Sequence, residues 1–448
     1  MRHSIATLVI RLLSLLRGET GVGAMVSTLW TNLLIMAINL GTGVLTARML
    51  GPEGRGELAA MTLWPQLLGY MVVLGLPTAL VYQAKCQPEL QRELMGAALV
   101  LSVAMGGISV LFGWWLIPIW LQHYSPEIVH FAQWMMFVAP LEVTGLVFMA
   151  GMQVMSHFTD YNRLRYFTPA FTLLALLLLV VSGNLSPFTA TLAYLLAAFP
   201  VFLWGLRWTW ISFRPVLSSF RSSSEALLSY AWRSAGSSLA TVLAPQLDRV
   251  LVLGLLSPAA MGLYVVAVSL ARTLSSLISP ISNVLLPKTA GRAPDEILAV
   301  TGRTVRATLA LTGAVALPLG LLAPWVLELL YGPGFVEATQ VFRILLLDAI
   351  FASAGMVLAQ AFLAVGKPGF VSILQGVSLI LTVILVMLLT PRFGLTGVAS
   401  AMLISTILRL LMINLSVPRI FNVAPPQLLP VWSELVDVMR LVRNTGRT

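Results

Sequence analysis

The chain has 448 residues, of which 58% are hydrophobic and 10% are charged, whereas soluble domains average about 45–50% and about 25%. The mean hydropathy is +0.91, which excludes a water-soluble globule and indicates a membrane protein with many spans. The excess of 27 Lys and Arg over 17 Asp and Glu would suit a nucleic-acid partner in a soluble chain. In a membrane protein we assign it to topology, and we expect no nucleic acid.

The first 21 residues are expected to lie on the membrane surface. Ser4, Thr7, Arg11 and Ser14 recur at helical spacing in an otherwise apolar stretch, which is typical of an interfacial amphipathic helix. The stretch lacks the small-residue cleavage site of a signal peptide. We therefore treat 1–21 as a separate surface segment.

Twelve apolar stretches follow, and each is predicted to be a transmembrane helix. About 20 apolar residues cross the hydrocarbon layer as a helix, and unpaired backbone groups are not tolerated in lipid. The fold class is therefore an all-α polytopic membrane protein. The stretches lie at 25–46, 58–82, 94–120, 128–154, 167–182, 187–211, 235–256, 261–286, 305–330, 339–364, 369–390 and 395–417.

Lys and Arg are distributed unequally between the two sides of these spans. The loops and termini on one side carry 20 of them, and the loops on the other side carry 4. Because cytoplasmic loops are enriched in Lys and Arg, both termini are expected in the cytoplasm. The polar linker 212–234 and the amphipathic tail 418–448 are expected on the same side, and a surface helix is the favoured interpretation of the tail.

The sequence contains an internal repeat at an offset of 206 to 207 residues. The repeat predicts an N-lobe at 22–211 and a C-lobe at 235–417, with six spans each. An even number of spans makes the repeats parallel, related by a pseudo-two-fold axis along the membrane normal, with a substrate path at their interface. This is the architecture of an alternating-access transporter. The matching pairs are Pro52 and Pro258, Gly56 and Gly262, Tyr124 and Tyr331, and Pro126 and Pro333.

Five ionisable residues inside the predicted spans are candidate functional residues, because such groups are costly in lipid. They are Glu142, its repeat counterpart Asp348, Asp248, Arg249 and Arg272. A buried carboxylate can carry a proton or bind Na⁺, and an arginine can bind a phosphate. The alternative is an interhelical ion pair that fixes packing. For Glu142 and Asp348 a structural ion pair and a functional role are equally favoured, and for Asp248 a structural role is at least as well supported as a coupling role. For Arg272 a substrate or cavity role is favoured.

The sequence shows no catalytic constellation. Lys367 lacks the spacing and the Ser or Thr of a phosphate-binding loop, and no Ser-His-Asp or paired-carboxylate arrangement is visible. The only cysteine is Cys86, and the four histidines are dispersed, so we expect no metal site and no bound cofactor. These observations favour a secondary transporter over an enzyme.

Three segments resemble the polysaccharide transporters, the Wzx-type oligosaccharide flippases of the multidrug/oligosaccharidyl-lipid/polysaccharide superfamily. They are 45–58 (LTARMLGPEGRGEL), a weaker repeat of that segment in 248–267, and 330–335 (LYGPGF). The resemblance extends from about residue 22 to 417. It implies two six-helix lobes around a cavity that opens alternately to each side. It also implies a polyprenyl-diphosphate-linked oligosaccharide as substrate, with Arg272 and Arg249 as the cations that could hold the diphosphate. The twelve spans differ from the fourteen of peptidoglycan-precursor flippases.

The resulting hypothesis is a flippase of the bacterial cytoplasmic (inner) membrane. It would serve O-antigen, capsule or exopolysaccharide biosynthesis, in contact with membrane lipids and with a polymerase or other assembly proteins. Glu142, Asp348 and Asp248 are candidates for coupling to H⁺ or Na⁺. The alternatives are an ion-coupled multidrug extruder, whose cationic drugs would favour a cavity dominated by Glu142 and Asp348, and a membrane enzyme or scaffold of polysaccharide synthesis.

Overall fold

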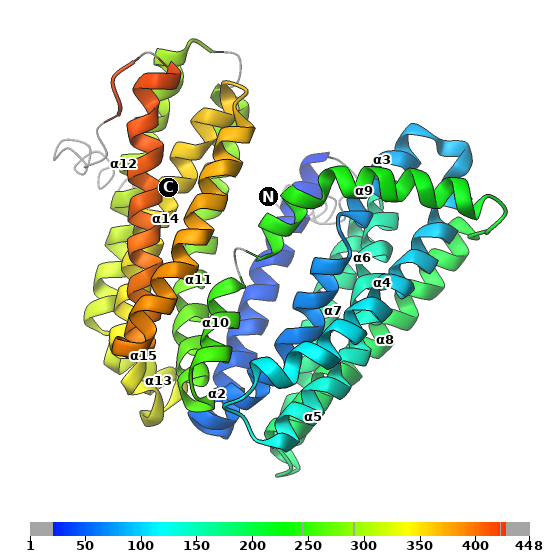
Figure 1. The fold of residues 1–448 in the computed structure, drawn as a ribbon, viewed down its shortest axis with the longest axis horizontal. Coiled ribbons are helices and arrows are strands. Elements are labelled where there is room, and N and C mark those ends of the chain that lie inside the picture. Colours follow the sequence, from blue (N-terminus) through cyan, green and yellow to red (C-terminus); the bar gives the residue numbers. More distant parts are fainter. Residues whose placement is uncertain (1–20, 244–245, 290–291, 422, 427–448) are drawn as a thin grey trace, which may run out of the picture. The chain divides into compact units, whose positions relative to one another are not determined.

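The computed structural model describes residues 21–243, 246–289, 292–421 and 423–426. Every regular element in these ranges is a helix (Figure 1), which confirms the all-α polytopic class. The amphipathic pattern of the first 16 residues lies outside the described residues. So do Glu434, Asp437 and Arg440, which carry the pattern of the tail.

The first six spans correspond to well-defined helices. Gly51 has a positive φ of 68° and divides α2 into two legs, which are spans one and two. A capping box between Ser186 and Thr189 begins α8, just after the turn at Gly183, where the sequence places the boundary between spans five and six. The elements are α2 (Gly21–Val72), α3 (Leu76–Cys86), η1 (Pro88–Leu90), α4 (Gln91–Trp120), α5 (Pro126–Met135), η2 (Met136–Val138), α6 (Ala139–Val154), α7 (Phe158–Val181) and α8 (Pro187–Phe213).

Span two is interrupted within its length. Leu74 and Gly75 both have left-handed backbone, with φ values of 48° and 88°, and they separate α2 from α3. A left-handed conformation is strained for leucine. Broken helices inside a membrane are tolerated where neighbouring protein or a polar cavity satisfies the freed backbone groups.

The helices after α8 include a second long helix that is divided at a glycine. Gly394 has a φ of 56° and divides α15 into the two legs that were expected as spans eleven and twelve. The elements are α9 (Phe220–Leu243), α10 (Leu247–Leu255), α11 (Pro258–Thr289), α12 (Pro294–Leu321), α13 (Ala323–Tyr331), η3 (Pro333–Ala338), α14 (Thr339–Ala364) and α15 (Pro368–Phe421).

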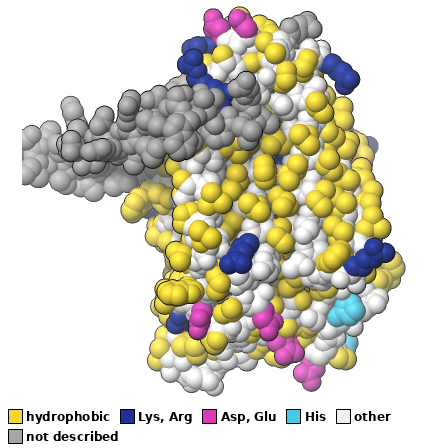
Figure 2. Space-filling model, turned by 90° about the vertical axis from the view of Figure 1, so that its left-hand side faces the viewer, with side chains coloured by type: hydrophobic (Ala, Val, Ile, Leu, Met, Phe, Trp, Pro, Cys, Tyr) yellow, Lys and Arg dark blue, Asp and Glu magenta, His cyan; other side chains and the backbone are white. Residues whose placement is uncertain are grey.

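Eight helical stretches of the described residues are long and apolar enough to cross a membrane. Two of them, Ser27–Val72 and Pro368–Phe421, contain the bends at Gly51 and Gly394 and so hold two legs each. Figure 2 shows one face of the molecule, where apolar side chains cover most of the middle and acidic side chains lie toward the two ends. Such a continuous apolar surface fits lipid and not water.

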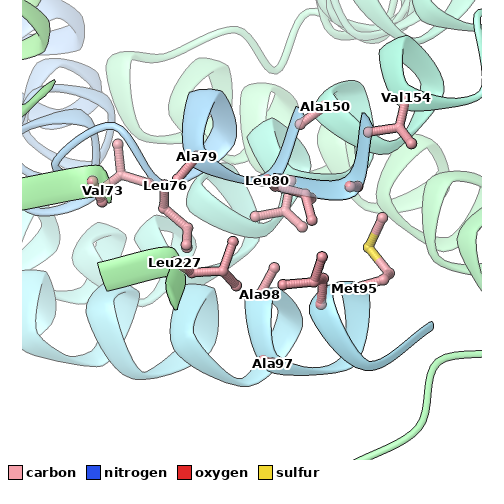
Figure 3. Packing of buried hydrophobic residues seen from close by; sticks show 14 of the residues in the cluster. Val73, Leu76, Ala79, Leu80, Met95, Ala97, Ala98, Ala150, Val154 and Leu227 are labelled. Carbon is pink, nitrogen blue, oxygen red and sulfur yellow. The ribbon is translucent and has the colours of Figure 1, made fainter. Parts of the chain in front are cut away.

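The chain forms two compact units. The first consists of residues up to Leu247 together with Ser257–Gly262, and the second of Asp248–Leu256 and the chain from Leu263 onward. In the first unit a buried cluster joins α3, α4, α6 and α9, with Leu80, Met95 and Leu227 at its centre (Figure 3). The expected linker 212–234 is therefore largely helical, and α9 packs on the first unit.

A reciprocal glycine contact occurs within the first unit. A Cβ atom added at Gly56 would lie 1.8 Å from the carbonyl oxygen of Pro258, and one added at Gly262 would lie 1.8 Å from that of Pro52. The two copies of the repeated Pro-x-x-x-Gly motif thus touch each other through the same pair of positions. Only glycine allows the backbones to come this close.

Replacing Gly56 or Gly262 by alanine tests this contact. The added methyl would overlap a backbone carbonyl, so the backbone must shift, and we expect a loss of about 1–3 kcal/mol. It should appear as a lower midpoint of thermal unfolding of the detergent-purified protein. Gly43→Ala is the matched control, since nothing lies within 4 Å of a Cβ there. Equal midpoints for Gly56→Ala and Gly43→Ala would contradict the close approach.

Cys86 provides a test of the predicted topology without any added tag. It is the only cysteine of the sequence, it is exposed, and it ends α3 on the Lys-rich and Arg-rich side. A membrane-impermeant maleimide should label it in inside-out vesicles and not in intact cells with a permeabilised outer layer. Glu53→Cys in a Cys86→Ser background, an exposed position of the opposite loop, should show the reverse. Labelling of Cys86 from outside would invert the topology.

Candidate functional site

The second unit contains a charged cluster built on the α10–α11 hairpin. Oδ2 of Asp248 accepts a hydrogen bond from the Tyr264 hydroxyl at 2.7 Å and one from Nη2 of Arg272 at 2.8 Å. Asp248 is 3% exposed and Tyr264 is fully buried, whereas the Arg272 side chain is 35% exposed. The buried carboxylate therefore fixes one edge of a guanidinium that is still accessible.

The hairpin explains why these residues meet. α10 and α11 are separated by a short turn at residues 256–257, and Asp248 and Tyr264 lie at similar distances in sequence on either side of this turn. Side chains of a helix point toward its N-terminus, and the long Arg272 side chain therefore reaches back along α11 toward Asp248. Asp248 also lies in the first turn of α10, where the helix dipole favours negative charge.

Asp348 joins the same cluster from α14. Thr406 of α15 lies near its carboxylate, and Arg409, Arg272 and Asp248 are all close enough to interact with it electrostatically. Nη2 of Arg409 lies 3.9 Å from the position of a Cβ at Gly355, two helical turns beyond Asp348 on α14. The second unit thus holds two carboxylates and two guanidinium groups on four helices.

The cluster has unused acceptors. Oδ1 of Asp248 and Oδ1 of Asp348 are both buried, and within the described part of the chain neither has a hydrogen-bond partner. A carboxylate oxygen that is withdrawn from water and left without a donor is costly. These two atoms could therefore accept a hydrogen bond from a ligand or from water.

The structure brings together three of the five sequence-predicted residues, Arg272, Asp248 and Asp348. Arg249, the next residue after Asp248, is half-buried and within electrostatic range of Tyr264. Reasoning from the sequence did not identify Tyr264, Thr406 or Arg409 as members of the cluster. Only the symmetry of the hairpin about its turn could have pointed to Tyr264.

Glu142 lies in the first unit, on α6, in different surroundings. Tyr70 of α2 is close enough to interact with it electrostatically, and Gln66 lies one turn before Tyr70 on the same helix. Glu142 and Tyr70 are half-buried and Gln66 is exposed. Among the described residues, no basic side chain forms an ion pair with Glu142.

The described residues contain no group of three or more His, Cys, Asp or Glu side chains that could hold a metal ion. The residues of the two sites themselves offer carboxylates, guanidinium groups, hydroxyls and the amide of Gln66. Guanidinium groups bind phosphate or carboxylate, and carboxylates bind protons or cations.

Comparison with solved structures shows a shared fold. A structure described as lipid II flippase MurJ in an inward closed conformation matches with a TM-score of 0.74 and 12% identity, over 92% of this chain and 90% of that one. An inward-facing multidrug resistance MATE family transporter of the MOP superfamily matches with a TM-score of 0.69 and 14% identity, over 86% and 95%. An outward-facing MATE structure gives a TM-score of 0.59 at 16% identity, over 91% and 97%.

No curated protein matches the sequence at a significant level. A family model described as polysaccharide biosynthesis protein matches residues 45–340, which is well over half of the chain and includes all five candidate residues except Asp348. Together with a fold shared by MurJ and MATE structures, this match agrees with the resemblance seen in the sequence. The chain is a multi-pass membrane protein of the MOP flippase and transporter fold, and it belongs to the polysaccharide biosynthesis protein family.

Proposed function

We propose that this protein moves a polyprenyl-diphosphate-linked oligosaccharide from the cytoplasmic to the outer leaflet of the bacterial inner membrane by alternating access. The product would feed a polymerase or other assembly proteins of surface polysaccharide synthesis. The observation that carries the proposal is Arg272, which is anchored by the buried Asp248 yet 35% exposed. Such a group is prepared to bind an anion and is costly to leave in lipid.

Recognition of the diphosphate would use the part of the guanidinium that Asp248 leaves open. Arginine presents five N–H donors in a planar fork that matches phosphate oxygens, and the only hydrogen bond described for Arg272 is made by Nη2. Asp248 and Tyr264 would act as positioning residues that hold this fork in one orientation. Arg249 is the second candidate contact.

The same cluster argues against the multidrug extruder. A site for cationic drugs needs carboxylates that are free to pair with the drug, but Asp248 is already bound to Arg272. Asp348 has Arg409 and Arg272 nearby. The shared fold does not discriminate between the two functions, because MurJ and MATE structures both match. The ion pair of Asp248 with Arg272 favours an anionic substrate at the second unit, whereas Glu142 of the first unit has no ion-pair partner among the described residues.

Variants of Arg272 test the proposal. Arg272→Lys keeps the charge but loses the fork, and Arg272→Ala loses both. Since hydrogen bonds to charged groups contribute about 1.5–3 kcal/mol, polymer export in a flippase-deficient strain should fall on the order of 10-fold for lysine and about 100-fold for alanine. The amount of protein in the membrane should not change.

Arg343→Lys is the control. Among the hydrogen bonds described, Nε of Arg343 donates only to the carbonyl oxygen of Gly320, at 2.9 Å. Export by this variant should remain near the wild-type level. Purified protein in liposomes should also flip a fluorescent polyprenyl-diphosphate oligosaccharide. Efflux of a cationic dye without flipping of the lipid would support the extruder instead. Wild-type export by Arg272→Ala would refute the assigned role.

A second set of variants separates a structural role of the ion pair from a substrate role. Asp248→Asn leaves Arg272 without its partner and should lower the free energy of unfolding by about 1–3 kcal/mol, measured by thermal unfolding in detergent. Tyr264→Phe should cost about 0.5–1.5 kcal/mol. The double variant Asp248→Asn, Arg272→Gln should be more stable than Asp248→Asn alone and yet export no polymer. Recovery of export in the double variant would make the pair purely structural.

A further inference from the structure

The first part of α9, residues 220–234, is fixed against the first unit along one face. α9 runs crosswise to the neighbouring helices of its unit (Figure 1). Leu227 and Ala231 are buried in the cluster with α3 and α4, and Figure 3 shows Leu227 within that cluster. The ring of Tyr230 stacks on that of Tyr82 in α3, with the ring centroids 4.6 Å apart. This segment is therefore an integral part of the unit and lies across its end.

The opposite face of the same segment exposes large apolar side chains. Trp232 is 74% exposed, and Leu228, which is also exposed, lies on the same side of the helix four residues earlier. Phe220 at the start of α9 and Leu217 in the preceding loop are exposed as well. Large apolar side chains that gather on one exposed face mark a contact with a membrane or another protein.

The exposed face is also basic. Between residues 207 and 234 the sequence has four arginines and a single acid. That acid, Glu225, is paired with Arg221 at a distance of 3.0 Å. Nε and Nη2 of Arg233 donate to the carbonyl and hydroxyl oxygens of Ser229, both at 3.1 Å, which holds this guanidinium along the exposed face. Tryptophan and leucine beside an excess of arginine are typical of a helix that lies on an anionic lipid surface.

The loop before α9 is held in place by α4. The backbone N–H of Val216 donates to the carbonyl oxygen of Arg92 at 3.2 Å, and Nε of Arg92 donates to the carbonyl oxygen of Arg214 at 3.2 Å. A Cβ atom added at Gly96 would lie 2.3 Å from the carbonyl oxygen of Val216, so only glycine lets the loop come this close. Because the loop and α9 are already ordered, a ligand that binds them loses little affinity to the ordering of the chain.

The last turns of α8 add a cavity on the same basic stretch. Its volume is about 360 Å³, and its lining residues are Leu203, Leu206, Arg207, Trp210 and Ile211. These residues recur three and four positions apart and so share one face of α8. Four apolar side chains around one guanidinium fit a molecule that has both an acyl chain and an anionic headgroup. A phospholipid has both, which favours lipid over a protein as the occupant.

We propose that the α8 cavity and the exposed face of α9, together called the lipid-binding surface, bind anionic phospholipids of the leaflet at the Lys-rich and Arg-rich end of the first unit. Trp232 and Leu228 enter the headgroup layer, where the amphipathic ring of tryptophan is favoured. Arg233 contacts phosphate oxygens there, and Arg207 holds the phosphate of one lipid in the cavity. The proposal concerns the surrounding lipid and does not depend on the transported substrate.

A fluorescent label at position 232 tests whether α9 lies in the headgroup layer. We expect Trp232→Cys in a Cys86→Ser background, labelled with an environment-sensitive dye in nanodiscs that contain phosphatidylglycerol, to be quenched by nitroxide-labelled lipid. Glu89→Cys in the same background is the control, because Glu89 is exposed on η1. Its label should be quenched by iodide in the water. Equal iodide quenching at positions 232 and 89 would overturn the proposal.

Native mass spectrometry of the detergent-purified protein tests which lipid is bound. The wild type should retain phosphatidylglycerol in preference to phosphatidylcholine. Arg207→Gln and Arg233→Gln should each lower the retained phosphatidylglycerol about 5-fold, which is the order of magnitude that one cation contributes at an anionic surface. Both side chains are exposed, so these variants should fold normally. Arg392→Gln, an exposed arginine between the two legs of α15, is the matched control and should behave as the wild type.

Equal retention of phosphatidylglycerol by the wild type and both variants would refute the assignment. A label at position 232 that is shielded in native membranes, yet quenched by iodide in nanodiscs, would show that a protein covers α9 and would also refute it. Neither measurement involves movement of a polyprenyl-linked substrate. Failure of the proposed transport function would therefore leave the lipid-binding surface unaffected.

Discussion

Lipid supplies neither hydrogen bonds nor counter-charges, so every charged side chain within the membrane has to be compensated by the protein itself. Asp248 shows how this is done, since its Oδ2 atom receives both the Tyr264 hydroxyl and the Arg272 guanidinium. The orientation of the Arg272 guanidinium depends on this one carboxylate. Removing one partner of a buried pair is costly because the other charge is left alone.

Much of the fold could be predicted from the sequence, because membrane spans are specified by length and hydrophobicity alone. The divisions of α2 and α15 coincide with Gly51 and Gly394, two glycines in the predicted gaps between spans, where a positive φ is needed for the chain to turn. The interruption at Leu74 was not predictable, since no local rule places leucine in the left-handed region. The helical character of 220–234 was also missed, because its serines indicate a polar linker although Leu227 and Ala231 are buried against α3 and α4.

The candidate site was predictable as a set of residues but not as an arrangement. The free-energy cost of placing an ionisable side chain in lipid depends on that residue alone. This cost identified Arg272, Asp248, Asp348 and Glu142 from the sequence. Which residues form an ion pair depends on how the chain folds, because the two partners can be far apart in sequence. Arg272 and Asp248 are 24 positions apart. Arg409 near the end of a span could be interpreted as reaching for the membrane surface until α14 placed Asp348 beside it.

The two units share a scaffold more closely than they share chemistry. In the first, Ser102 of α4 and Thr144 of α6 are joined by a hydrogen bond of 3.0 Å, and in the second, Thr312 of α12 and Ser353 of α14 are joined by one of 3.2 Å. Both pairs connect the third and fourth spans of their unit, where small hydroxyl residues allow close packing and hold helices together in lipid. These neutral contacts do not change with the charge of a ligand. Function could therefore diverge between the units by exchanging single residues, such as Glu142 and its repeat counterpart Asp348, on helices that neutral contacts hold together.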